Sequence, residues 1–193
     1  MEETFNIMGI DPGSRSIGVS VYEIEPKILN GDMDLDIVKI LTYNISIDDE
    51  DNRGIHEALI DRTSRIARIM KSLYSLYEPA MVGMESSFIN ISRMSAVIPL
   101  SRAIEAIESS IYSIDRYAKI VTSPPGVIKK VFGSKQVGKD AVLLALKNKP
   151  HLESKIESLK MSDHEVDGVA IAYTLLEYIK TTKGMICIKY LEV

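Results

Sequence analysis

The sequence contains a single cysteine, Cys187, among its 193 residues, so no disulfide can form within the chain. So few cysteines are typical of a reducing compartment, and the cytoplasm is the simplest expected location. No run of about 18 apolar residues occurs, and the acidic start MEETFNIM lacks the basic region of a signal peptide. We therefore expect neither a membrane span nor a secretory signal.

Low-complexity tracts and internal repeats are also missing, which excludes a solenoid and a largely disordered chain. Hydrophobic residues make up 46% of the sequence, and 193 residues are enough for one sizeable core. We expect a single domain over residues 1–193.

The net charge is −4, but the charged residues are unevenly distributed along the chain. Residues 1–61 contain 14 acidic and 4 basic side chains, whereas residues 116–160 contain 10 basic and 3 acidic ones. The basic segment favours a polyanionic partner such as a nucleic acid, although a solvated lysine-rich helical face is the more common cause of any single cluster.

Hydrophobic periodicity predicts an α/β chain. Strands are expected over residues 5–10, 16–22, 33–45, 80–86 and 118–123, with an edge strand over 185–193, and helices over 53–77, 95–117, 124–133, 138–148 and 162–180. The polar residues 25–36 and the acidic residues 48–51 are expected to form connections. Three successive strands followed by alternating helices and strands predict a mixed sheet.

Two carboxylates come at the ends of apolar strands. Asp11 follows the first strand in IMGIDPGSRSIGVSV, and Glu85 follows the buried segment AMVGM. Crossover connections bring the carboxyl ends of parallel strands together, and ligands bind at that edge. Aspartate before Pro-Gly is also a common turn residue, so Asp11 alone has a structural explanation. Glu85 would be costly within a sheet unless it were paired or bound to a metal ion.

The last predicted helix adds further candidates near its start. Ser162 and Glu165 form a capping box, and Asp163 is a favourable first-turn residue. His164 and Asp167 are three residues apart and share one face. Carboxylates gathered at one edge repel each other unless a divalent cation neutralises them, and oxygen-rich ligation suits Mg²⁺ or Mn²⁺. Two such ions about 4 Å apart can activate water and stabilise the leaving oxygen of a phosphodiester.

The motifs GIDPGSRSIG, MESSF and HEVDGVAIAY, in this order, resemble the RuvC family of Holliday junction resolvases over roughly residues 5–180. The resemblance implies an RNase H-like fold, in which a five-stranded mixed sheet is flanked by helices on both faces, here with an extra C-terminal strand. It also implies a homodimeric, Mg²⁺-dependent endonuclease with two ions per site, which makes paired symmetric nicks in a four-way DNA junction.

By the same resemblance, Asp11, Glu85, His164 and Asp167 match the family's metal-binding set, whose third position is aspartate in some members and histidine in others. Whether His164 is a metal ligand or an acid/base for the attacking water stays open.

Three further matches concern DNA binding. Phe88 is similar to the family's aromatic residue that stacks on opened bases, although a phenylalanine is more often a core residue. Lys129 or Lys130, together with Lys139, resembles the family's lysines beside the scissile phosphate.

Rival interpretations exist at two levels. GIDPGSRSIG also resembles the first phosphate loop of actin-like and sugar-kinase ATPases, but those proteins need a second such domain. Within the nuclease interpretation, a relative that cuts flaps, forks or RNA-containing structures and a non-catalytic junction-binding protein are the alternatives. Residues 25–51 and the segment beyond Lys183 depart from the family pattern and leave partner contacts open.

Overall fold

The computed structural model describes residues 4–29, 32–47, 54–86, 94–132, 139–149, 152–157 and 159–182. Its sheet has the order β3-β2-β1-β4-β5, built from β1 (Phe5–Asp11), β2 (Ser16–Leu29), β3 (Asp32–Ser46), β4 (Met81–Glu85) and β5 (Ile120–Ser123). The first three strands are antiparallel neighbours, while β4 pairs in parallel with both β1 and β5. The predicted mixed sheet is therefore confirmed.

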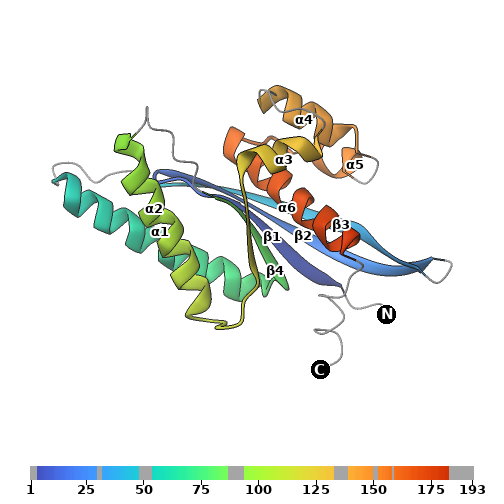
Figure 1. Ribbon diagram of the computed structural model, residues 1–193, viewed down its shortest axis with the longest axis horizontal. Helices are drawn as coiled ribbons and strands as arrows, with labels where there is room; N and C mark the ends of the chain where they lie inside the picture. The colour runs from blue at the N-terminus through green and yellow to red at the C-terminus, as the bar shows by residue number, and fades with distance from the viewer. Residues whose placement is uncertain are drawn as a thin grey trace.

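Helices cover both faces of this sheet (Figure 1). They are α1 (Ile55–Tyr77), α2 (Met94–Tyr112), α3 (Pro125–Val131), α4 (Lys139–Lys147), α5 (Glu153–Ile156) and α6 (Asp163–Thr181). One core includes Met8 and Ile10 of β1 with Ile107 of α2, and the other includes Ile7 of β1 with Ile171 of α6. The alternating side chains of β1 thus serve two hydrophobic cores, which is why the strand is apolar throughout.

The connection expected over residues 25–36 was wrong. β2 continues to Leu29 and β3 begins at Asp32, so most of this polar segment lies in a long hairpin. Lys27 forms ion pairs with Glu25 at 3.1 Å and with Asp36 at 3.0 Å. These pairs neutralise part of the negative charge of the hairpin. Pro26 lies beyond the part of β2 that pairs with β1, where a missing N–H is tolerated.

Helix boundaries follow local signals to different degrees. As predicted, α1 ends before Glu78 and Pro79, and Glu78 takes a left-handed φ of 43° while its N–H donates to Tyr74. α2 ends at Tyr112, before the predicted residue 117, and Pro99 lies inside it. Ile107 and Ile111 of this helix are fully buried, whereas Ile114 lies beyond the helix end and is exposed.

Two expectations concern the end of the chain and the membrane. The strand expected over residues 185–193 lies outside the described residues. Among the helices that the structure describes, none combines the length and the apolar character needed to cross a membrane.

Candidate active site

Asp11 and Glu85 occupy equivalent positions at the ends of neighbouring parallel strands. Gly9 pairs with Gly83 and Ile10 with Met84, so Asp11 and Glu85 are the next residues along. Ile10 and Met84 point into the core beneath α1 and α2, and because side chains alternate along a strand, both carboxylates point toward α6. Neighbouring strands are about 4.8 Å apart. The structure therefore brings these two carboxylates side by side, as the sequence predicted.

α6 reaches this edge because glycines let its backbone lie directly on the sheet. A Cβ atom placed on Gly18 would stand 1.7 Å from the carbonyl oxygen of His164, and one on Gly9 would stand 2.4 Å from that of Gly168. Only glycine permits such contacts between main chains. These glycines belong to the motifs GIDPGSRSIG and HEVDGVAIAY, and their spacing is the sequence signal that could have revealed this approach.

His164 contacts Asp11 directly. The His164 Nδ1 atom lies 2.7 Å from Asp11 Oδ2, and the Asp11 side chain is only 13% exposed. An ionised carboxylate can only accept hydrogen bonds, so Nδ1–H of His164 is the donor. In the neutral imidazole, Nε2 then has a free lone pair that can accept a proton or bind a metal ion.

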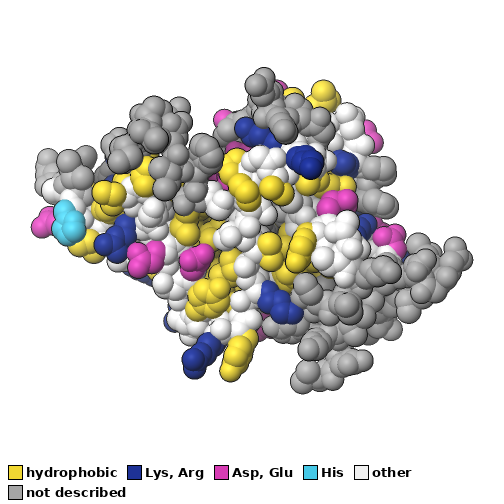
Figure 2. All heavy atoms as spheres, in the orientation of Figure 1, with side chains coloured by type: hydrophobic (Ala, Val, Ile, Leu, Met, Phe, Trp, Pro, Cys, Tyr) yellow, Lys and Arg dark blue, Asp and Glu magenta, His cyan; other side chains and the backbone are white. Residues whose placement is uncertain are grey.

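Glu85 and Asp167 line one pocket beside α3, together with Lys129 and Phe132. Asp167 is thus on the same side of α6 as the strand-end carboxylates, in a half-buried position at the pocket that Lys129 also lines. Lys130 is exposed next to Lys129. Figure 2 shows lysine and arginine side chains over the α3 and α4 region of this face.

The four predicted site residues gather as two neighbouring pairs. Asp11 contacts His164, Glu85 and Asp167 share a pocket, and Asp11 adjoins Glu85 in the sheet. Within the described ranges, no three or more histidine, cysteine, aspartate or glutamate side chains are close enough to hold one metal ion.

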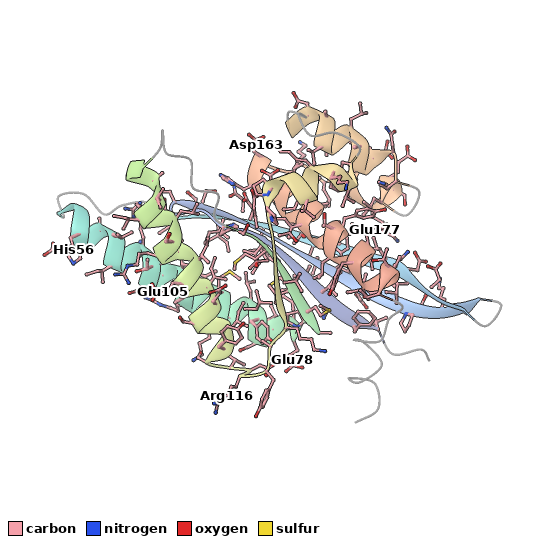
Figure 3. The ribbon with its side chains drawn as sticks, in the orientation of Figure 1. His56, Glu78, Glu105, Arg116, Asp163 and Glu177 are labelled. Atoms are coloured by element: carbon pink, nitrogen blue, oxygen red, sulfur yellow. The ribbon has the colours of Figure 1, made fainter. Side chains whose placement is uncertain are left out.

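Two of the predicted DNA-binding residues are not placed. Phe88 lies outside the described residues, and Lys139 begins α4 while its side chain lies outside them. Asp163 is exposed on the first turn of α6, where Figure 3 labels it.

The capping box at the start of α6 is confirmed, and it extends to the sheet. Glu165 Oε2 accepts hydrogen bonds from the backbone N–H and the hydroxyl of Ser162, both at 2.8 Å. Its other oxygen accepts from the Thr42 hydroxyl at 2.9 Å, a contact that the sequence did not indicate. Burial raises the pKa of Glu165, but these hydrogen bonds outweigh burial and leave the pKa below its ordinary value.

Comparisons with known proteins agree with this architecture. No family model matches the chain. A protein of Orientia tsutsugamushi (strain Ikeda), the crossover junction endodeoxyribonuclease RuvC, is 29% identical over 172 residues, which cover 87% of this chain and 92% of the relative.

Solved structures show the same fold at lower identity. The Thermus thermophilus RuvC structure superposes with a TM-score of 0.69 at 19% identity, covering 93% of this chain and 98% of that one. T. thermophilus RuvC in complex with a Holliday junction substrate gives 0.65 at 16% identity with the same coverage. The yeast mitochondrial Holliday junction resolvase Ydc2 gives 0.57 at 12% identity over 93% of this chain and 84% of that one. In sequence this chain is similar to a RuvC protein, and its fold is that of the solved RuvC structures.

Proposed function

We propose that this protein is a metal-dependent crossover junction endodeoxyribonuclease, which resolves Holliday junctions in DNA recombination by paired symmetric phosphodiester nicks. One observation carries the proposal. Asp11 and Glu85 end adjacent parallel strands, and their side chains point to the face that α6 covers. On that face His164 contacts Asp11, and Asp167 shares a pocket with Glu85. Similarity to a RuvC protein, and to a RuvC structure solved with a Holliday junction substrate, supports this substrate class.

The donor chemistry fits a hard divalent cation. Three carboxylates and one imidazole, without a thiol, suit Mg²⁺, with Mn²⁺ as a substitute ion, better than structural zinc. Asp11, Glu85, His164 and Asp167 would hold two ions per site. When bound, such ions activate a water molecule and stabilise the leaving oxygen of the phosphodiester.

The protein's own residues orient the catalytic groups and neutralise the charge of the DNA backbone. Asp11 fixes the ring of His164, so that Nε2 is available either to bind a cation or to take a proton from water. Lys129, at the wall of the Glu85 and Asp167 pocket, and the adjacent Lys130 supply positive charge for a phosphate of the DNA backbone. Lys139 and Phe88 are proposed to contact DNA as well, Phe88 by stacking on bases.

A four-way junction has twofold symmetry, which a C₂ dimer with two identical sites would match. The outward side of α2 exposes Ile98 by 66% and Tyr112 by 45%, and a homodimer interface would bury such side chains. We propose that the active form is this homodimer and that it works in the reducing cytoplasm.

The decisive experiment offers the protein a synthetic four-way junction, a linear duplex, a flap and an RNA–DNA hybrid, each with and without Mg²⁺. We expect paired symmetric nicks in the junction, dependent on Mg²⁺, and little cleavage of the duplex. Equal cleavage of flaps or hybrids would instead indicate a broader nuclease. Junction binding without cleavage would indicate a non-catalytic binding protein.

A further inference from the structure

A row of hydroxyl-bearing side chains on β2 and β3 faces the first half of α6. Ser20 pairs with Gly9 on one side and with Thr42 on the other, so these three residues lie in line across three strands. Tyr22 is two residues further along β2 and therefore points to the same face as Ser20. Ser20 and Tyr22 are completely buried.

Each of these hydroxyls donates a hydrogen bond to α6. The Ser20 hydroxyl donates to the carbonyl of Gly168 and the Tyr22 hydroxyl to the carbonyl of Val169, both at 2.8 Å. The Thr42 hydroxyl donates to the Glu165 carboxylate at 2.9 Å.

The acceptors flank the candidate site residues of this helix. Glu165 lies between His164 and Asp167, and Gly168 and Val169 directly follow Asp167. A helical carbonyl has a second lone pair besides the one used in the helix, so the bonds from the strands are additional to those that form α6. Their effect is to set the axial position and the rotation of α6 on the sheet.

We propose that Ser20, Tyr22 and Thr42 are positioning residues of the active site, which act through α6 to place His164 and Asp167 against the strand-end carboxylates. The inference rests on the proposed function, because it assigns these hydroxyls to the geometry of the metal-binding set. Burial, and then the neighbouring phenol of Tyr173, raise the pKa of Tyr22 well above its ordinary value, so that its hydroxyl remains a donor at neutral pH.

The test combines Tyr22→Phe with Thr42→Val, because both changes remove a hydroxyl and keep most of the side-chain volume. Mn²⁺ binding by the purified protein is measured by paramagnetic resonance without DNA, and Mg²⁺-dependent junction nicking is measured separately. We expect about 10-fold weaker Mn²⁺ binding, the loss typical when groups that orient metal ligands are removed. When Thr42→Ser replaces Thr42→Val in this double variant, the hydroxyl is kept, and Mn²⁺ binding should return toward that of the wild type.

Thr174→Val is the matched control. Thr174 is a buried α6 residue whose hydroxyl donates at 2.8 Å to Ala170 within the same helix, so it does not tie α6 to the sheet. This variant should lower the unfolding temperature and leave Mn²⁺ affinity unchanged.

The outcomes separate this inference from the proposed function. If the wild type binds Mn²⁺ and nicks junctions while the double variant binds Mn²⁺ equally well, the positioning role is wrong and the proposed function stands. Equal weakening by Thr174→Val would also overturn the role, because general destabilisation would then explain the loss. A wild-type protein that binds no Mn²⁺ overturns both.

Discussion

Asp11 is a carboxylate placed where charge is costly. Its side chain is almost buried, and it adjoins Glu85 in the sheet, so that two carboxylates lie at neighbouring strand ends. His164 donates a hydrogen bond to it across the gap between sheet and helix. Like-charge repulsion of this kind raises the free energy of the folded, metal-free protein.

Asp11→Asn should therefore abolish junction nicking and leave junction binding intact. The amide oxygen can still accept from His164, while one repelling charge is lost, so we expect the metal-free free energy of unfolding to be unchanged or higher. Nicking assays, binding titrations and denaturant unfolding measure the three quantities. A variant that is unfolded, or one that nicks at the wild-type rate, would refute the role of Asp11.

Tyr43 gives a pH-dependent prediction away from the site. Burial, followed by its hydrogen bond to the Tyr77 hydroxyl, raises the pKa of Tyr43 from 10.0 to about 12. The unfolded chain releases this proton at lower pH than the folded protein does, so the stabilisation is complete below pH 10 and is lost as the pH rises toward 12.

We expect Tyr43→Phe to be less stable than the wild type at neutral pH and the difference to shrink in this alkaline range. The difference should be below about 1 kcal/mol, because Tyr43 is partly exposed to solvent. Denaturant unfolding at a series of pH values measures it. A constant difference across the range would contradict the shifted pKa.

At the scale of single elements, the bounds of α6 were predicted closely. The predicted range 162–180 and the observed Asp163–Thr181 nearly coincide, because the capping box is a local signal that needs no tertiary partner. The extent of β2 and β3 could not be predicted in the same way. Their polar ends are stabilised by each other, through the ion pairs of Lys27, and the sequence pattern does not encode such pairs.

The packing of α6 on β2 depends on Gly18, and Gly18→Ala should disrupt it. The added methyl group would collide with the backbone of His164, and backbone atoms cannot move aside as the end of a flexible side chain can. We expect a loss of about 2–3 kcal/mol in the free energy of unfolding, the usual cost of overpacking.

Gly126→Ala is the control for this substitution. Gly126 lies in α3, and a Cβ atom there would meet nothing within 4 Å. Alanine should therefore stabilise this helix slightly, by up to about 1 kcal/mol. Thermal or denaturant unfolding compares the two variants, and equal behaviour would show that close approach is not the reason for glycine at position 18.

For the whole molecule, charge is divided between two regions. The β2–β3 hairpin includes Glu25, Asp34 and Asp36, whose partners are Lys27 and Lys180, whereas Lys129 and Lys130 lie at the last turn of α3 beside the candidate site. A DNA backbone would therefore approach from the α3 side. The sign of this asymmetry was readable from the sequence, but the position of Lys129 at the wall of the pocket required the fold.

Replacing Lys129 and Lys130 with alanine should weaken junction binding and make its salt dependence shallower. The slope of log K against log salt should decrease by about 1 for each phosphate contact that is lost. Lys27→Ala is the matched control, because its charge is already compensated within the hairpin. Binding titrations over a range of salt concentrations test this, and an unchanged slope in the lysine variant would argue against phosphate contacts by α3.

Most of the candidate site was predictable because its members stand at strand ends and at a capped helix start. The adjacency of Asp11 and Glu85 follows from parallel pairing, which the order of elements implies. The hydrogen bond from Thr42 to Glu165 joins residues 123 positions apart and depends on strand register, which no local pattern specifies.

The direct backbone contact of α6 with β1 and β2 has a broader consequence. Where two main chains touch with no side chain between them, their spacing is set by the size of the peptide backbone itself. The separation between α6 and the strands that end in Asp11 and Glu85 therefore depends on glycine at positions 9 and 18 more directly than on any apolar side chain of the core.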